Sequence, residues 1–480
     1  MINKRQFYIN GAWVNPSATN DHPVINPSTE EPCAIISLGG QADTDAAVAA
    51  ARAAFPAWMA TSPADRIAYV EKILEVYKTR AEDLAQAMSL EMGAPITMSR
   101  ESQVTSGTWH ISNFITAARA FQFDAPLGDH APNDRIIHEA VGVIGMITPW
   151  NWPMNQVTLK VIAGLIAGCT MVLKPSEESP LDALIFAEIV GAAGLPRGVF
   201  NLVNGDGAGV GSQLTTHPEV DMISFTGSAR AGRLISKSAA DTLKRVSLEL
   251  GGKGANLIFA DADDKAVRRG VIHCMNNTGQ SCNAPTRMLV QREIYDRAVE
   301  EAAAVAASIK VGPAHEEGRH IGPVVNAAQF AKIQDLIQKG IDEGARLVAG
   351  GTGRPDGLNR GFFVKPTVFA DVTNEMTIAR EEIFGPVLSI IPFETEEEGL
   401  AIANDTPYGL TNYVQTGDPA RANRLARALR SGMVEMNGKS LSAGAPFGGM
   451  KQSGHGREGG KWGIEDFLEV KAVSGWTPGA

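Results

Sequence analysis

The sequence predicts an α/β protein built on parallel sheets, because three observations agree. Between residues 157 and 260, apolar strand-like segments alternate with helical segments, as in consecutive βαβ units. A second alternating region covers about residues 255–440. The chain has 480 residues, of which 44% are hydrophobic and 20% charged, so it has room for about two to four domains with buried cores.

The N-terminal third is expected to be mainly helical. Gly, Pro, Asn and Ser punctuate residues 1–40, which predicts short strands and turns. Helical spacing follows in three segments, 44–59, 64–92 and 96–121. A polar stretch with Pro126, Gly128 and Pro132 then leads into one strand-like segment, 135–147, so a domain boundary or a hairpin is expected there.

The first alternating region favours nucleotide binding, because parallel sheets covered by helices on both faces commonly bind nucleotides. Its expected strands are 169–174, 199–203, 221–225 and 245–250, and its expected helices are 157–167, 181–193, 207–215 and 229–240.

The second region has the same pattern and predicts a second α/β domain. Its expected strands are 255–259, 287–290, 362–369 and 387–393, and its expected helices are 263–275, 291–308 and 326–343. A glycine-dense loop at 446–460 and a last strand at 467–476 complete the chain.

Charge and cysteine content exclude several classes of protein. Forty-three Lys and Arg residues against 53 acids give a net charge of −10, which disfavours general binding to nucleic acid or anionic membranes. Four cysteines form no C-x-x-C pair, so we expect no disulfide framework and no metal site. The N-terminus has no secretory signal pattern, and the longest apolar run, 161–173, is shorter than the ~20 residues of a membrane helix. A cytoplasmic protein is expected.

Two residues could perform chemistry but also have ordinary explanations. Cys282 has small and polar neighbours, which suit an accessible nucleophilic thiol, yet a lone cysteine is more often a small buried hydrophobe. Glu249 precedes a Gly-Gly pair that would let backbone approach a ligand, or it is a surface glutamate before a turn. Their spacing does not show that they meet.

Asn151 lies in the segment TPWNWPMNQVTLK, residues 148–160, where two prolines and two tryptophans make a stiff loop. Its amide could donate to a developing oxyanion, or it could cap the next helix.

Three further segments could bind a ligand. Lys174 ends a predicted strand and Glu177 follows it, where an acid can accept hydrogen bonds from a ribose, or it is only a favourable charge near a helix start. Gly227 and Gly232 open a helix but lack the G-x-G-x-x-G spacing of a dinucleotide loop. The segment 379–390 offers Glu382 and Phe384, either as ligand contacts or as a solvated charge and a core aromatic.

Taken together, the motifs TPWNWP, LKPSE, FTGS, ELGGK, GQSC, EEIFGP, N-G and PFGGMKQSG resemble the aldehyde dehydrogenase superfamily in order and approximate separation, over nearly the whole chain. The resemblance implies a Rossmann-like cofactor domain, a second α/β catalytic domain and a small β oligomerisation flap, assembled into dimers or tetramers. The corresponding ranges are 1–120 and 141–251 for the first, 252–450 for the second, and 121–140 with 466–480 for the flap.

The resemblance also implies catalytic roles. Cys282 would attack an aldehyde to form a thiohemiacetal, whose oxyanion Asn151 and the backbone N–H of Cys282 would hold. Hydride transfer to NAD would leave a thioester, and Glu249 would activate water to hydrolyse it. Lys160 and Glu458 match a second polar pair, associated with proton relay or substrate handling.

The implied cofactor contacts follow the same motifs. They are Thr148, Trp150, Lys174, Ser176, Glu177, Gly207, Gly211, Phe225, Thr226, Gly227, Ser228, Leu250, Glu382 and Phe384. A carboxylate at Glu177 would repel a 2′-phosphate, which favours NAD, although NADP use stays possible.

The substrate is expected to have a polar or carboxylate-bearing tail, such as an oxo-acid semialdehyde. Ser281 and Asn283 flank the thiol, and Asn276 stands where many relatives have an aromatic side chain. The entrance would be lined by Trp152, Asn155, Gln156, Leu159 and the segment around Lys439.

The chain also resembles a bacterial branch that includes long-chain oxo-acid and pyridine-semialdehyde dehydrogenases. Two rival interpretations are a CoA-acylating aldehyde dehydrogenase, which Glu249 disfavours, and a non-catalytic structural or binding protein that keeps the fold.

Overall fold

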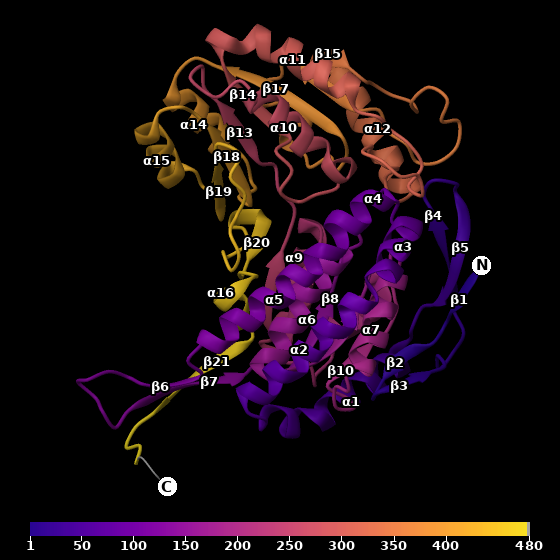
Figure 1. The fold of residues 1–480 in the computed structure, drawn as a ribbon, viewed down its shortest axis with the longest axis vertical. Helices are drawn as coiled ribbons and strands as arrows, with labels where there is room; N and C mark the ends of the chain where they lie inside the picture. Colours follow the sequence, from indigo (N-terminus) through magenta and orange to yellow (C-terminus); the bar gives the residue numbers. More distant parts are fainter. Residues whose placement is uncertain (478–480) are drawn as a thin grey trace.

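The computed structural model describes residues 1–477, and Figure 1 shows how its two main sheets are arranged. The first sheet has eight strands, of which the five central ones are parallel and the edges antiparallel. In spatial order they are β20 (Gly454–His455), β12 (Arg245–Glu249), β11 (Met222–Thr226), β8 (Val143–Ile147), β9 (Thr170–Lys174), β10 (Phe200–Leu202), β2 (Phe7–Ile9) and β3 (Ala12–Val14). The predicted parallel sheet is confirmed.

The second sheet has seven strands and is parallel except at β15. Its order is β15 (Arg346–Ala349), β16 (Thr367–Ala370), β17 (Val387–Phe393), β14 (Arg287–Gln291), β13 (Ala255–Ile258), β18 (Thr411–Gln415) and β19 (Met433–Met436). The second predicted α/β region is therefore also confirmed.

Two three-stranded sheets complete the fold. One lies near the N-terminus and contains β1 (Ile2–Lys4), β5 (Glu31–Ser37) and β4 (Asp21–Asn26). The other extends from the body beside the C-terminal segment in Figure 1 and contains β21 (Leu468–Val473), β7 (Arg135–Ala140) and β6 (Asp124–Pro126).

The helices fall into two groups by their order along the chain, although the last one, α16, lies beside α5 of the first group (Figure 1). The first group is α1 (Gln41–Met59), α2 (Pro63–Thr79), α3 (Ala81–Glu91), α4 (Ile96–Met98), η1 (Ser99–Gln103), α5 (Val104–Ala120), α6 (Pro153–Ala167), α7 (Leu181–Ala192), α8 (Ser212–Thr216) and α9 (Ala229–Ala239). The second group is α10 (Ala266–Met275), α11 (Tyr295–Ser308), α12 (Ala327–Asp342), α13 (Thr377–Arg380), α14 (Glu396–Asn404), α15 (Pro419–Ala428) and α16 (Gly460–Asp466).

Helices cover both faces of the first sheet, as expected from its sequence. Along β9, Met171 and Leu173 belong to the apolar cluster formed with α6 and α7, whereas Val172 between them belongs to a cluster with α1. Successive side chains of a strand point to opposite faces, so this alternation places one helical layer on each side.

Helix α6 is the central helix of the first layer. Pro153 occupies its first turn, where the missing N–H costs nothing, and Gly168 ends it with a φ of +94°. Every residue of α6 except Asn155 is buried. A helix that is apolar nearly all round requires packing on all sides, and α6 receives it from the sheet and neighbouring helices.

Some predicted elements are wrong in detail. The expected strand 135–147 is two strands, β7 and β8, in different sheets, because Gly142 turns the chain with a φ of +140°. A Cβ at Gly142 would lie 1.9 Å from the Asp221 Oδ2 atom, so another residue would not fit.

Of the expected strand 362–369 only the end forms β16, since Pro366 has no N–H for the ladder. The expected helix 207–215 begins as a π-helical turn, η2 (Gly207–Gly211), and the helical segment 64–92 is divided into α2 and α3.

The strand register brings several predicted site residues to one edge of the first sheet. Glu249 ends β12 and pairs with Thr226, which ends β11. Lys174 ends β9 opposite Ile147, the residue before Thr148. Because the carboxyl ends of parallel strands meet at the same edge, a ligand can contact all of these segments at once.

Within residues 1–477, no helix is long and apolar enough to cross a lipid bilayer. No group of three or more His, Cys, Asp or Glu side chains in this described part of the chain could hold a metal ion.

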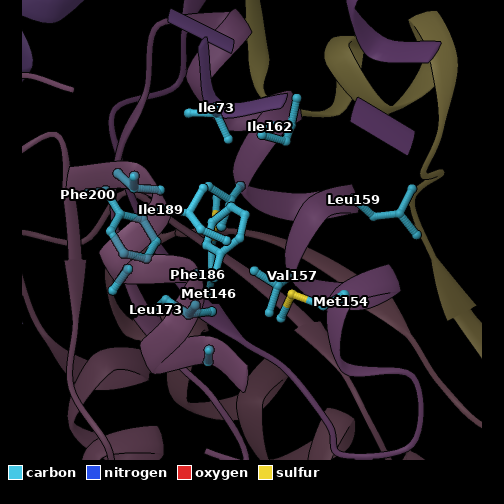
Figure 2. Close-up of a cluster of buried hydrophobic side chains, with 14 of the residues drawn as sticks. Ile73, Met146, Met154, Val157, Leu159, Ile162, Leu173, Phe186, Ile189 and Phe200 are labelled. Carbon is cyan, nitrogen blue, oxygen red and sulfur yellow. The ribbon is translucent and has the colours of Figure 1, made fainter. Parts of the chain in front are cut away.

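Substitution of Phe186 by alanine should destabilise the first layer. Its ring lies among the apolar side chains shown in Figure 2, 6.0 Å from the ring centre of Phe200, and is fully buried. We expect Phe186→Ala to lower the free energy of unfolding by about 3–5 kcal/mol. Leu234→Ala is the control, because Leu234 is largely exposed and its loss should cost less than about 0.5 kcal/mol. Urea denaturation measures the free energy of unfolding of both variants, and equal losses would contradict the assignment of Phe186 to the core.

Candidate active site

A cavity of about 210 Å³ lies at the carboxyl edge of the first sheet and is bordered by segments of the second. The predicted residues that line it are Trp150, Asn151, Thr226, Gly227, Ser228, Glu249, Leu250, Cys282, Glu382 and Phe384. The structure thus brings together the predicted thiol, amide and carboxylate, which the sequence spacing left unconnected.

The segment before Cys282 has a strained backbone. Asn277, Thr278 and Gly279 all have positive φ, between 51° and 71°. This conformation is unusual for a β-branched residue such as Thr278. A Cβ at Gly279 would lie 2.1 Å from the Gly385 carbonyl oxygen, so only glycine fits there. The hydroxyl of Thr278 donates to the Gly322 carbonyl at 3.0 Å, which helps to hold the turn.

Asn151 is bound to this same segment. Its side-chain Nδ2 donates to the Gln280 carbonyl oxygen at 3.0 Å, and its own carbonyl accepts from the Asn277 amide at 2.8 Å. Asn151 does not cap α6, because the residue before that helix is Trp152 and no side-chain cap bond is present. The alternative explanation of Asn151 as a helix cap is therefore wrong, and its amide lies against the Cys282 loop.

Glu249 is 3% exposed, so it is not a surface glutamate. Neither of its carboxylate oxygens has a hydrogen-bond partner among the described residues. Burial, followed by the nearby Glu458 carboxylate, raises the pKa of Glu249 well above its usual range. A Cβ at Gly448 would lie 2.6 Å from Glu249 Oε1, so the glycine-dense loop 446–460 packs directly on this carboxylate.

Lys160 and Glu458 form a buried ion pair beside Glu249. The Lys160 side chain is 1% exposed and comes from α6, whereas Glu458 comes from the glycine-dense loop. The second carboxylate oxygen of Glu458 has no partner within residues 1–477. The pair therefore links the loop to the central helix and leaves one oxygen free to accept a hydrogen bond.

The Cys282 thiol lies among three carboxyl groups, those of Glu382, Glu249 and Glu458. Burial raises the pKa of Cys282 above its ordinary value, and the carboxylates of Glu382, Glu249 and Glu458 raise it further. In the ligand-free chain the thiol is therefore protonated at neutral pH.

Glu382 and Phe384 form the opposite wall of the cavity. Glu382 Oε1 accepts from the Gly252 backbone N–H at 2.8 Å, and burial raises the pKa of this carboxyl. The rings of Phe384 and Trp150 meet edge to face at 5.6 Å between centres. The alternative of a solvated charge and a core aromatic is wrong, because both side chains line the cavity.

The remaining predicted cofactor residues lie along the same sheet edge, outside this cavity. Lys174 Nζ is 3.0 Å from Glu177 Oε2, and the Thr148 backbone N–H donates to the Lys174 carbonyl at 3.1 Å. A Cβ on Gly211 would lie 3.9 Å from Lys174 Cδ, which places η2 beside this pair. Ser176 is buried after β9, Gly207 begins η2, and the Phe225 ring packs beneath Gly227.

Two residues from outside all the predicted motifs also line the cavity, Gln329 and Lys332 of α12. Gln329 Nε2 donates to the Phe384 carbonyl at 2.7 Å, and Lys332 Nζ donates to the Glu382 carbonyl at 2.8 Å. They hold the backbone of the EEIFGP segment. Apart from a helical spacing of three, nothing in the local sequence distinguishes them.

A second cavity, of about 670 Å³, is lined by Trp152 and Asn283, the residues that follow Asn151 and Cys282, and we call it the entrance cavity. Of the residues expected to line the substrate entrance, Trp152, Asn155, Leu159 and Asn283 do so. Ser281 accepts a hydrogen bond from the Trp152 indole N–H at 2.8 Å, Gln156 is buried in α6, and Asn276 lines neighbouring cavities. The segment around Lys439 also lines this cavity, through Ser440, Leu441, Ser442 and Gly444, whereas the Lys439 side chain itself is exposed and is not part of the wall.

Comparison with known proteins agrees with this geometry. Residues 13–473 match the sequence model of the Aldehyde dehydrogenase family. The chain is 49% identical over 478 residues, 99% of each chain, to 3-succinoylsemialdehyde-pyridine dehydrogenase of a Pseudomonas species. The crystal structure of an aldehyde dehydrogenase from Bartonella henselae is similar with a TM-score of 0.98 and 60% identity, covering 99% of this chain and 100% of that one. Aldehyde dehydrogenase C of Pseudomonas syringae, solved as a cysteine-to-alanine mutant with NAD+ and octanal, has a TM-score of 0.97 and 48% identity, covering 99% and 98%.

The raised pKa of Cys282 predicts slow alkylation of the ligand-free protein. Only the thiolate reacts, so the rate with iodoacetamide should rise about tenfold per pH unit across about pH 6–8, without a plateau. Mass spectrometry of the modified peptide measures this rate, and Cys282→Ala gives the background from other thiols. A plateau already below about pH 7 would show that the thiol is ionised at rest.

Proposed function

The chain belongs to the aldehyde dehydrogenase family, and we propose that it oxidises aldehydes to carboxylic acids with NAD through an intermediate bound to Cys282. One observation supports this most directly. Asn151, Glu249 and Cys282, from three distant segments, line one cavity at the edge of the first sheet.

The residues at the sheet edge fit a dinucleotide. The Glu177 carboxylate, about a quarter exposed and held by Lys174, suits the two hydroxyls of a ribose. Ser228 caps α9, and a helix that starts here offers backbone N–H groups to a pyrophosphate. Glu382 and Phe384 would hold the nicotinamide end. NAD, when bound, accepts a hydride from the carbon attached to sulfur. The Glu177 carboxylate favours NAD over NADP.

In the first half-reaction, Cys282 loses its proton and its sulfur adds to the aldehyde carbon, forming a thiohemiacetal. Glu249 is the nearby base able to take the proton, because it is buried and has no hydrogen-bond partner among residues 1–477. The carbonyl oxygen becomes an oxyanion, which the Asn151 amide and the Cys282 backbone N–H stabilise. One such donor contributes about 3–4 kcal/mol to related transition states. Loss of the hydride from the same carbon leaves a thioester.

Before the second half-reaction, Glu249 releases to solvent the proton that it took from Cys282. It then takes a proton from water as the water adds to the thioester carbon. The carbon–sulfur bond breaks, Glu249 gives this proton to the departing sulfur, and the carboxylic acid leaves with the thiol restored. Lys160 and Glu458 support this step. Their ion pair fixes the glycine-dense loop that packs on Glu249, and the second carboxylate oxygen of Glu458 can relay a proton.

Two alternatives are less well supported. Transfer of the acyl group to CoA needs no base for water, whereas Glu249 is buried and unpartnered next to the thiol. A non-catalytic protein would have no need for a buried ion pair and strained backbone around one thiol.

The substrate we favour is a semialdehyde with a polar tail. The polar flanks of Cys282, Ser281 and Asn283, support this, and a curated relative at 49% identity is a semialdehyde dehydrogenase.

We further propose the division into a cofactor domain (1–120 and 141–251), a catalytic domain (252–450) and an oligomerisation flap (121–140 and 466–480). The paired strands β6, β7 and β21 support the flap, although residues 478–480 lie outside the described chain. Val470, 66% exposed on this sheet, is an apolar contact suited to a second copy in a dimer or tetramer.

Replacement of the thiol tests the proposed function. Cys282→Ala should abolish aldehyde-dependent NADH formation and leave NAD binding intact, because only the nucleophile is removed. Cys33→Ala, in β5, is the matched control and should retain activity. Absorbance of NADH and binding by calorimetry measure the two properties, with NADP assayed in parallel. Residual turnover in Cys282→Ala near the wild-type rate would exclude the covalent route.

Replacement of the base tests hydrolysis. Glu249→Gln should lower kcat by about 10²–10⁴-fold, because the thioester no longer receives an activated water. Where acyl-enzyme formation survives, rapid mixing should show at most one NADH per site and mass spectrometry an acylated Cys282. The wild-type rate should increase with pH, since the raised pKa of Glu249 keeps it protonated until higher pH. Glu300→Gln, on an exposed face of α11, should change nothing. Unaltered turnover in Glu249→Gln would contradict its role.

A further inference from the structure

The entrance cavity leads to the reacting thiol from the side opposite the cofactor. Adjacent residues of two loops line the two cavities: Asn151 and Cys282 line the first, and Trp152 and Asn283 line the second. Glu458, whose charge acts on Cys282, also lines the entrance cavity. An aldehyde bound with its carbon at the thiol therefore has its tail in the entrance cavity.

The charged groups in the wall of the entrance cavity are carboxylates. Glu101 of η1 and Glu435 of β19 line its outer part, and Glu458 lines its inner end. Glu458 is already paired with Lys160, so the two outer carboxylates are the ones that face an incoming tail. Among residues 1–477, neither lysine nor arginine is part of this wall.

Cations line three adjoining cavities. Lys310 and Arg319 line one that shares Glu101 and Ser102 with the entrance cavity, Lys461 lines one that shares Asn113 and Gly444, and Arg268 and Arg269 line one that shares His273 and Glu435. Arg269 there is paired with Asp263 at 2.8 Å and also donates to Gln415. Arg268 lines that cavity from an exposed position. A tail that ends inside the entrance cavity therefore meets the carboxylates first.

Two histidines in the wall supply no positive charge. Burial lowers the pKa of His110 to about 4 and also lowers that of His273, so both rings are neutral at physiological pH. His110 Nε2 lies 2.6 Å from Asn155 Oδ1, and a neutral ring donates in this contact. With its oxygen engaged, Asn155 has its amide N–H groups left to donate to a ligand.

Aromatic rings form the other part of the wall. Trp109 from α5, Trp152 and Phe447 all line the entrance cavity. The Trp152 ring is fixed by its indole hydrogen bond to Ser281, next to the nucleophile. Trp109 is 43% exposed, so its ring lies at the solvent side. The cavity therefore has one flat apolar surface near the thiol, Trp152, and another at the solvent side, Trp109. Together with the amide donor of Asn155, these surfaces suit a planar group that carries a hydrogen-bond acceptor.

We propose that the entrance cavity selects aldehydes whose tail is uncharged and planar, with an acceptor such as a ketone oxygen or ring nitrogen, and that it disfavours aldehydes with a carboxylate tail. This inference rests on the proposed function and narrows it. Of the two tails expected from the sequence, polar or carboxylate-bearing, the geometry favours the polar one. A carboxylate in this cavity would be desolvated beside like charges, which costs affinity.

A matched set of aldehydes tests the proposal. The set is succinic semialdehyde, its methyl ester, the analogue in which a phenyl ketone replaces the carboxylate, and pentanal. Assays at about pH 8.5 keep Glu435 ionised, because burial raises its pKa to about 7. We expect kcat/KM for the methyl ester and the phenyl ketone to exceed that for succinic semialdehyde by at least about tenfold. An equal or higher value for succinic semialdehyde would overturn the proposal.

Two variants assign the effect to named residues. Glu435→Gln should raise the ratio of kcat/KM for succinic semialdehyde over its methyl ester several-fold, whereas Glu300→Gln should leave that ratio unchanged. Asn155→Leu should reduce kcat/KM for the phenyl ketone more than for pentanal. An unchanged acid-to-ester ratio in Glu435→Gln, or equal losses for both aldehydes in Asn155→Leu, would count against the proposal.

Pentanal separates the two levels of inference. If pentanal is oxidised and succinic semialdehyde is preferred, only the tail selectivity fails. If no aldehyde of the set is oxidised, the proposed function fails and the selectivity fails with it.

Discussion

The site depends on the attachment of the Asn151 segment to the loop before Cys282. The Asn151 amide donates to the Gln280 carbonyl, and the Asn277 amide donates back to the Asn151 carbonyl. These reciprocal bonds join the end of β8 in the first sheet to a strained turn of the second α/β region. Buried hydrogen bonds of this kind are costly to leave unmade, so they fix the distance between the amide donor and the sulfur before any substrate arrives. The strain at Thr278 persists because the surrounding structure holds it.

The sheets supply the rigid frame for this attachment. Parallel strands β8, β9, β11 and β12 end at one edge, and their registers place Thr226 beside Glu249 and Ile147 beside Lys174. Apolar clusters on both faces of the sheet keep the strands in place. The buried helix α6 then positions Lys160 toward the glycine-dense loop, and its single partly exposed residue, Asn155, faces the entrance cavity. One helix therefore connects the core, the catalytic side chains and the substrate wall.

Local patterns in the sequence were sufficient to predict the alternation of strands and helices. A buried parallel sheet requires continuous apolar strands between its helices, and such strands can be recognised in the sequence. The same patterns did not predict the division at Gly142, because its positive φ and the Asp221 side chain that leaves no room for a Cβ there are features of the folded chain. The site motifs identified Cys282, Glu249 and Asn151 as candidates, but only the fold brings them together. Gln329 and Lys332 could not be found, because they contact the backbone carbonyls of a segment about fifty residues away. The segment around Lys439 lies where it was expected, because Ser440, Leu441 and Ser442 line the entrance cavity, but the Lys439 side chain is exposed and is not part of the wall.

Charge distribution links the two cavities. Glu249, Glu382 and Glu458 all act on the thiol. Lys160 pairs with Glu458, and Lys332 and Lys253 lie near Glu382. Burial is the main cause of the raised pKa of the thiol, and the carboxylates raise it further where they are ionised, which explains a protonated resting thiol. Ionised carboxylates favour a positively charged ring on the cofactor side and oppose a second anion on the substrate side. Glu101 and Glu435 extend the same sign outward through the entrance cavity. The carboxylate product that forms at Cys282 would then be repelled along the path by which the uncharged aldehyde entered, so the arrangement that disfavours anionic substrates also favours release of the acid.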